Sequence, residues 1–353
     1  MNALALALII GTQEPNLKAQ EASLLATLDQ HFWDAKHQRW REMVGSDDEV
    51  FLWGYSVLLS TFANGAKVDP ATYKPRLEQA FNGLAKYWTT KAPGAYAVSP
   101  GQNSKNPDRY YDDNAWVGLA AMEAFDATKE RKYLDIAKKV MTYLRSGEDA
   151  KLGGGIYWHE NKKESKNACV NAPAAMLAFR LHRVTGDQTT LKEANRWLDW
   201  TSKLVDPNDG LVMDNMNIAG KVEQTKWSYN SACYYQASRL SFGSALHPTT
   251  GPPHAYRTED IHNKILWASE SRWVDYQRLL IKNPGMFGMH LLEVLIETKP
   301  NEVQKLVASI FEKCRNEQGL FGEYWDRKPL PGEKLKLMYT ASLLRTALLC
   351  RTR

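Results

Sequence analysis

The sequence has little of what marks several common classes of protein. Among 353 residues there are four cysteines, at positions 169, 233, 314 and 350, and none belongs to a C-x-x-C motif. Cysteine and histidine do not recur at the spacing of a zinc site, so no metal site is predicted. Four cysteines in a chain of this length do not indicate a disulfide scaffold, and we expect free, buried thiols.

Charge of one sign and long apolar runs are also scarce. The net charge is +5, and the basic residues are interspersed with acids rather than gathered in a nucleic-acid stripe or a polybasic membrane segment. The apolar run at residues 3–10 is too short to span a bilayer. It is similar to the hydrophobic part of a signal peptide without the basic leader. We expect residues 1–14 to be an export-signal remnant or a tail that packs on the domain, and the protein to be secreted, periplasmic or on the cell surface.

Strand signals are sparse, whereas helical periodicity recurs along most of the chain. Apolar stripes at helical spacing predict helices at residues 17–33, 51–62, 73–88, 114–125, 131–145, 167–182, 190–204, 227–241, 256–271, 286–298, 302–316 and 337–350. Some of these segments are apolar nearly all round and others have one charged face, so buried and half-buried helices alternate. Short hairpin pieces are expected at 155–158 and 321–325, and a loop at 243–254.

The alternation of helices carries a weak internal repeat. At a fixed offset of 57 residues, Thr128, Glu130, Leu134 and Ala137 correspond to Thr185, Asp187, Leu191 and Ala194. A repeat of this length is typical of a repeated helical hairpin, and the chain holds about six such pairs. This predicts one all-α domain over residues 15–353, a toroid of inner helices ringed by outer ones. An open α-solenoid is the alternative, but the apolar inner helices favour closure.

One stretch, residues 110–116, combines two adjacent carboxylates with aromatic rings. It reads Tyr-Tyr-Asp-Asp-Asn-Ala-Trp and leads into an apolar helical segment. A helix start favours carboxylates, because its backbone N–H groups are unpaired and carry partial positive charge. Asp112 and Asp113 therefore allow two interpretations, which are helix capping alone and a catalytic pair at the mouth of the toroid.

The chemistry of the second interpretation is glycoside hydrolysis, in which two carboxyl groups flank the scissile bond. Neighbouring residues at a helix start point about 100° apart, which allows the short carboxyl separation, roughly 5–5.5 Å, of a retaining enzyme. Two such charges resist joint ionisation, so one carboxyl keeps its proton to higher pH, as an acid and a nucleophile require. Candidate sugar contacts offer stacking faces or amide groups: Tyr111, Asn114, Trp158, Asn167, Trp227, Tyr229 and Asn230.

Three motifs resemble glycoside hydrolase family 76, the α-1,6-mannanases, in order and spacing. They are residues 110–116, the segment Gly154-Gly155-Ile156-Tyr157-Trp158 followed by Lys166-Asn167-Ala168, and Trp227-Ser228-Tyr229-Asn230. The resemblance covers most of the chain and is clearest over residues 50–240. It implies an (α/α)6 barrel and a retaining, endo-acting hydrolase of α-mannan. It also implies Asp112 as nucleophile, Asp113 as general acid/base, and no metal or other cofactor.

The chain departs from the family pattern at two places. Ser231-Ala232 stands where the family commonly has Gln-Gly, and residues 286–290 lack the expected Phe-Lys-Gly element. Two other functions therefore stay open. Another sugar enzyme on the same barrel, an epimerase or an unsaturated glucuronyl hydrolase, would place catalytic histidines or a split acidic pair at the mouth. A non-catalytic glycan-binding protein would bind mannan without cleaving it.

The remaining polar motifs predict no further chemistry. The histidines at 159, 247, 254 and 262 do not form a metal-binding H-x-x-x-H or H-E-x-x-H pattern. Lys166, at the end of a mixed charge run from residue 159, allows two interpretations, a substrate contact and a solvated side chain, and solvation is favoured. We expect a monomer that acts on α-mannan polysaccharide or oligosaccharide, with no nucleic-acid partner and no membrane span.

Overall fold

The computed structural model describes residues 16–242 and 259–352, so the apolar run at 3–10 and the loop predicted at 243–254 lie outside the described residues. The described chain forms twelve α-helices. They are α1 Leu17–Phe32, α2 Leu52–Val68, α3 Pro70–Leu84, α4 Tyr111–Thr128, α5 Arg131–Ser146, α6 Ala168–Thr185, α7 Gln188–Ser202, α8 Ser228–Phe242, α9 Glu259–Trp273, α10 Gly285–Ile296, α11 Pro300–Lys313 and α12 Leu337–Arg351.

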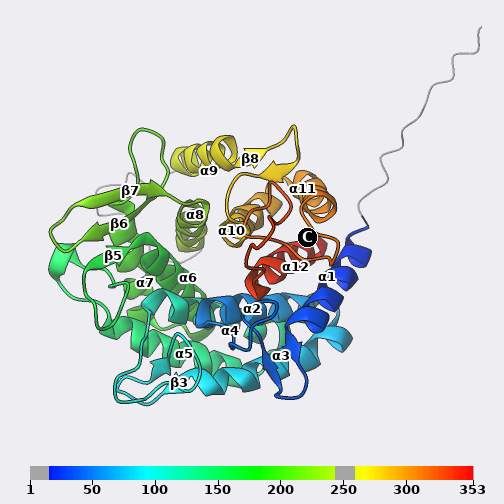
Figure 1. Ribbon diagram of the computed structural model, residues 1–353. Coiled ribbons are helices and arrows are strands. Elements are labelled where there is room, and N and C mark those ends of the chain that lie inside the picture. Colours follow the sequence, from blue (N-terminus) through cyan, green and yellow to red (C-terminus); the bar gives the residue numbers. More distant parts are fainter. Residues whose placement is uncertain (1–15, 243–258, 353) are drawn as a thin grey trace, which may run out of the picture.

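The even-numbered helices form a closed inner ring (Figure 1). Each packs on the next, and the ring closes where α12 packs on α2. The odd-numbered helices lie outside, with α3 on α2, α5 on α4, α7 on α6, α9 on α8, and α1 and α11 on α12. The predicted toroid is therefore confirmed and the open solenoid is wrong. Closure follows from the apolar character of the inner helices, since α4, α6 and α12 bury residues on most of their surface.

The 57-residue repeat is visible in the ends of two inner helices. Lys129 after α4 and Gly186 after α6 both have left-handed backbone, with φ of 61° and 71°. Thr128 donates to Ala124 O and accepts from the N–H of Glu130. Thr185 makes the same two bonds one repeat later, with Leu181 and Asp187. The repeat therefore encodes one helix–turn–helix geometry used twice.

Two helix ends differ from the predicted ends by four residues or more. Helix α2 continues to Val68, beyond the predicted end at 62, because Gly65 inside it is a packing site: a Cβ there would lie 2.3 Å from the ring of Tyr73. Helix α3 ends at Leu84, before the predicted end at 88. A short 3-10 helix, Ala85–Tyr87, follows it, and Trp88 then pairs with Tyr96 in a strand ladder.

The strands are short and connect the helix ends at one end of the barrel. They are β1 Trp33–Asp34, β2 Arg39–Trp40, β3 Trp88–Thr89, β4 Ala95–Tyr96, β5 Ser165–Asn167, β6 Met213–Asn217, β7 Val222–Lys226, β8 Val274–Asp275 and β9 Leu280–Ile281. Strands β5, β6 and β7 form one antiparallel sheet that the sequence did not predict, because its residues are polar and partly exposed. The hairpin pieces expected at 155–158 and 321–325 instead make single bridges to other segments, such as Tyr157 with Lys166 and Tyr324 with Pro284.

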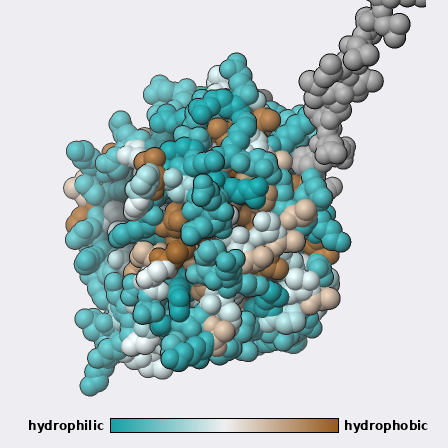
Figure 2. Space-filling view, turned by 45° about the vertical axis from the view of Figure 1, so that its right-hand side comes forward, coloured by the Kyte–Doolittle hydropathy of each residue, from teal (hydrophilic) through white to brown (hydrophobic). Residues whose placement is uncertain are grey.

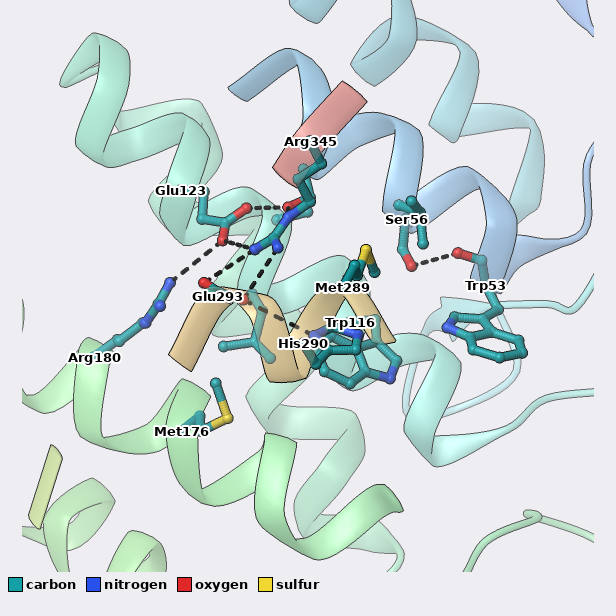
Figure 3. Close-up of a pocket in the computed structure, with 14 residues that line it drawn as sticks. Trp53, Ser56, Trp116, Glu123, Met176, Arg180, Met289, His290, Glu293 and Arg345 are labelled. Carbon is teal, nitrogen blue, oxygen red and sulfur yellow. Dashed lines mark hydrogen bonds and ion pairs between the residues drawn. The ribbon is translucent and has the colours of Figure 1, made fainter. Parts of the chain in front are cut away.

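The barrel interior contains a buried ion network, shown in Figure 3. Arg345 of α12 lies between Glu123 of α4 and Glu293 of α10, with N–O distances of 3.0 Å to each. Ser60 of α2 donates to Glu123 and accepts from Arg345 Nε. Arg180 of α6 approaches Glu123 to 3.9 Å. Five of the six inner helices thus contribute to one network, which fixes how the ring closes.

The surface is mostly hydrophilic on the face that Figure 2 shows, with hydrophobic residues scattered over it. Among the described residues, no helix has both the length and the apolar character that a membrane crossing requires. All four cysteines are free and buried, which confirms that prediction.

Candidate active site

The aspartate pair lies in the first turn of α4, at the end of the barrel where the inner helices begin. We call this end the mouth. The residue before the helix, Tyr110, has extended backbone and makes no side-chain cap bond. Asp112 and Asp113 are the acidic residues of the first turn. Their position next to the free N–H groups of the helix start suits carboxylates.

Asp112 has one anchored and one unpaired oxygen. Trp158 donates its indole N–H to Oδ2 of Asp112 at 2.8 Å. The thiol of Cys169, on the first turn of α6, lies 3.6 Å from the same oxygen. The other oxygen, Oδ1, is buried and has no partner among the described residues. Capping alone does not account for this arrangement, because two side chains from other segments hold the carboxylate.

The two carboxyl groups of the pair differ in pKa. Burial raises the pKa of Asp112 to about 6, although the Trp158 hydrogen bond works in the opposite direction. Burial also raises the pKa of Asp113 well above its usual value, and the negative charges of Asp112 and Asp108 raise it further. Asp112 therefore ionises first and Asp113 keeps its proton, which is the division of labour between a nucleophile and an acid.

The two neighbouring tyrosines lie in different places. Tyr111 is fully buried, stacks on Tyr143 with ring centroids 4.5 Å apart, and lies away from the mouth. Tyr110 contacts the rings of Trp158 and His159, and its pKa is raised by burial and by Asp108, Asp113 and Asp112. The tyrosine that faces the pair is thus Tyr110, which sequence reasoning missed because it depends on the exact start of the helix.

An aromatic platform lies at the mouth, at the starts of α2, α8 and α10. Phe287 lies at its centre, stacked on Tyr229 at 4.4 Å and on Trp53 at 5.7 Å, with Trp227 at 5.3 Å. All four rings are partly exposed. Phe287 supplies an aromatic ring in the segment 286–290, which lacks the lysine of the expected Phe-Lys-Gly element.

A groove of about 500 Å³ continues from this platform across the starts of α2, α10 and α12. Trp53 borders it, and Tyr339 and Glu323 line it further out. Trp158, 41% exposed, donates its indole N–H to Asp112. The mouth therefore offers several aromatic faces near the pair.

The asparagines have mainly structural partners. Asn114 is fully buried, accepts from the N–H of Tyr96, and donates to Tyr96 O and Tyr110 O. Asn171, one repeat later, bonds the N–H and carbonyl of Ile156 in the same way. In α8, Ser231 accepts from the N–H of Val212. Although Ser231 departs from the family pattern, its hydroxyl thus still connects an inner helix to the preceding loop by a hydrogen bond.

The other two predicted asparagines lie closer to the mouth. Asn167 precedes α6 and accepts from Ser165 at 2.7 Å. Asn230 donates to Asp214 of β6 at 3.3 Å, and its Oδ1 is buried without a partner in the described chain. Asp214 also raises the pKa values of Cys169 and Tyr229, though burial is the larger cause for both. Asp214 is therefore a third acid near the pair, which sequence reasoning missed because β6 was not predicted.

The prediction that Lys166 is solvated is wrong. Its side chain is fully buried. Its ammonium group donates to Asp149 Oδ1 at 2.7 Å and to the carbonyls of Lys151 and Gly154 at 2.9 and 2.8 Å. The lysine thereby holds the glycine-rich turn that precedes Trp158. Within the described ranges, no group of three or more His, Cys, Asp or Glu residues is placed to hold a metal ion.

Comparisons with known proteins agree with this geometry. The model of the family described as glycosyl hydrolase family 76 matches residues 16–243. The chain belongs to this family. Among curated proteins, it is 24% identical over 233 residues to the mannan endo-1,6-alpha-mannosidase DCW1 of Candida albicans, covering 61% of this chain and 45% of that protein. It is 25% identical over 212 residues to the meiotically up-regulated gene 191 protein of Schizosaccharomyces pombe, covering 56% and 47%. The family 76 chain spans about half the length of these curated relatives.

Solved structures show the same fold. A family 76 α-mannanase of Bacteroides thetaiotaomicron matches with a TM-score of 0.84 at 24% identity, covering 94% of each chain. An inactive variant of an α-1,6-mannanase from Salegentibacter, with two consecutive aspartates replaced by asparagine and α-1,6-mannotriose bound, matches with a TM-score of 0.75 at 20% identity, covering 96% of this chain and all of that one. The predicted (α/α)6 barrel is confirmed by the ring of helices and by these likenesses.

Proposed function

We propose that this chain is a retaining, endo-acting α-1,6-mannanase in which Asp112 is the nucleophile and Asp113 the general acid and base. The observation that carries the proposal is the half-buried aspartate pair at the mouth. No lysine or arginine of the described chain forms an ion pair with either carboxylate, and their raised pKa values differ in the sense that the reaction needs. Because ionised carboxylates without cations are costly to bury, such a pair favours a catalytic role.

The mechanism follows from the order of the two pKa values. Asp112, ionised first, attacks the anomeric carbon while the glycosidic carbon–oxygen bond breaks. The leaving oxygen takes the proton of Asp113. Asp113, now a base, removes a proton from the water that releases the sugar from Asp112, and is itself reprotonated for the next cycle.

The substrate is supported by relatives and by the shape of the mouth. The Candida relative is named a mannan endo-1,6-alpha-mannosidase, and the inactive Salegentibacter variant binds α-1,6-mannotriose. In this chain, the aromatic rings of the mouth and the groove of about 500 Å³ that Trp53 borders suit a chain of several sugars. A polymeric substrate of this kind agrees with action outside the cytoplasm, which we propose as the location.

The experiment that assigns the roles uses linear α-1,6-mannan and product stereochemistry. Proton NMR of the first product should show the α-anomer, as double displacement requires. Asp113→Asn should lose most activity on mannan but keep cleaving an aryl mannoside, whose leaving group needs little protonation, and azide should accelerate it. Asp112→Asn should fail on both substrates. A β-anomer as first product would show inversion and contradict the nucleophile assignment.

A further inference from the structure

Cys169 is a buried thiol with a specific partner in the catalytic centre. It lies in the first turn of α6 and is 4% exposed. Its sulfur lies 3.6 Å from Asp112 Oδ2, the oxygen that also accepts the Trp158 N–H. Cys233, Cys314 and Cys350 are buried as well, but they lie on α8, after α11 and on α12. Cys169 is thus the cysteine whose thiol meets an ionisable group of the proposed reaction.

The surroundings of the Cys169 thiol keep it protonated, so that it can donate a hydrogen bond. Burial, together with the charges of Asp112 and Asp214, raises the pKa of Cys169 well above its usual value, so the sulfur keeps its hydrogen. The Tyr229 hydroxyl is hydrogen-bonded to the thiol. Since that hydroxyl can donate to the sulfur, the S–H is free to point at Asp112. Tyr229 itself is fixed by its stack on Phe287.

We propose that Cys169 is a positioning residue for the nucleophile: its S–H and the Trp158 indole N–H together hold Oδ2 of Asp112 and thereby orient the carboxylate. This inference rests on the proposed function. As the bond between the Asp112 carboxylate and the anomeric carbon forms, the glycosidic bond breaks and its electron pair leaves with the oxygen that takes the Asp113 proton.

The test compares Cys169→Ala and Cys169→Ser with the matched control Cys314→Ala, a buried cysteine near the end of α11. The first readout needs no activity. The side-chain carboxyl signals of 13C-labelled aspartate are titrated by NMR, with Asp112→Asn identifying the Asp112 signal. Loss of a donor to the ionised form should raise the pKa of Asp112 in Cys169→Ala. Cys169→Ser keeps a donor on a shorter bond and should give an intermediate value.

The second readout is turnover of linear α-1,6-mannan. We expect kcat of Cys169→Ala to fall about threefold to tenfold with KM unchanged, because a weak sulfur hydrogen bond is lost. The acid limb of the rate profile should move to higher pH by the amount seen in the titration. The control should match the unsubstituted protein in both readouts.

Two outcomes would overturn the inference. One is an unchanged Asp112 titration and unchanged kcat in folded Cys169→Ala. The other is an equal loss in Cys169→Ala and Cys314→Ala, which would show a general packing effect. If the unsubstituted protein does not cleave mannan but the Asp112 titration still shifts, the proposed function is wrong and the hold of Cys169 on Asp112 is upheld.

Discussion

Two pairs of carboxylates lie inside the same ring of helices, and their surroundings are opposite. At the mouth, Asp112 and Asp113 have no ion-pair partner in the described chain, and burial raises both pKa values. Deeper in the barrel, burial is the largest single influence on Glu123 and Glu293 and would raise their pKa values, but Arg345, together with Arg180 at Glu123 and His290 at Glu293, lowers both. The deep pair is neutralised by a cation and holds the ring together. The mouth pair lacks one, which costs stability and leaves it available for chemistry.

The largest expected effect is on the deep pair. Arg345→Met should destabilise the fold by about 3 to 5 kcal/mol, because it leaves two buried glutamates without their cation. Urea unfolding measures this. Adding Glu123→Gln and Glu293→Gln to the same chain should recover much of the loss. The control is Arg315→Met, in a surface pair with an exposed Glu312, where the change should stay within about 0.5 kcal/mol. A small effect of Arg345→Met would show that the network does not close the ring.

Removing a carboxyl group from the mouth pair should stabilise the fold, whereas removing Arg345 from the deep network should destabilise it. Asp113→Asn should stabilise the protein by about 1 to 2 kcal/mol at pH 7 while it removes activity on mannan. A carboxyl whose pKa is raised by folding contributes stability below its unfolded pKa and loses it as pH rises towards the folded value. The gain from Asp113→Asn should therefore be present at pH 7 and absent near pH 4. Thermal unfolding across this range measures it, and a destabilised variant at pH 7 would contradict the unpaired state of the carboxyl.

Trp158→Phe tests how much the indole N–H that donates to Asp112 contributes to catalysis. It keeps the ring but removes the N–H that favours ionised Asp112, so kcat should fall about tenfold. The acid limb of the rate profile is expected near the Asp112 pKa of about 6 in the unsubstituted protein and should move to higher pH in the variant. Trp267→Phe, on an exposed ring of α9, is the matched control. Identical profiles for both variants would exclude the N–H as a determinant of the Asp112 pKa.

The smallest expected effect concerns the aromatic platform. Phe287→Leu removes the ring on which Tyr229 and Trp53 stack, and should raise KM for long mannan about threefold with little change in kcat. An aryl mannoside that does not reach the platform serves as control and should be unaffected. Equal losses on long and short substrates would place the effect in the catalytic centre instead.

Much of this architecture was predictable because it rests on local patterns. The one-sided apolar stripes predicted the outer helices, and the segments that are apolar nearly all round predicted a closed ring of inner helices. The 57-residue repeat matches the two turns after α4 and α6. The aspartate pair was found because it is contiguous in sequence. Its position at the mouth followed from the start of an inner helix.

What the sequence did not reveal depends on contacts between distant segments. Arg345 meets Glu123 across 222 positions, and no local pattern indicates that pairing. Lys166 looks solvated in a charged run, but the carbonyls of a glycine-rich turn surround it. Cys169 and Asp214 are far from the pair in sequence, and only the folded positions of α6 and β6 bring them close to it. Whether Tyr110 or Tyr111 faces the aspartates depends on a single residue at the helix start.

The most direct test of the central claim compares the two consecutive aspartate pairs of the chain. Turnover of linear α-1,6-mannan, followed by chromatography of the products, is measured for Asp112→Asn, Asp113→Asn and the double variant Asp47→Asn/Asp48→Asn. The last pair lies exposed on a loop. The account predicts short oligomannosides from the unsubstituted protein and from the loop variant, and losses of about a thousandfold or more in each mouth variant with the fold retained. Near-normal rates in either mouth variant would contradict it.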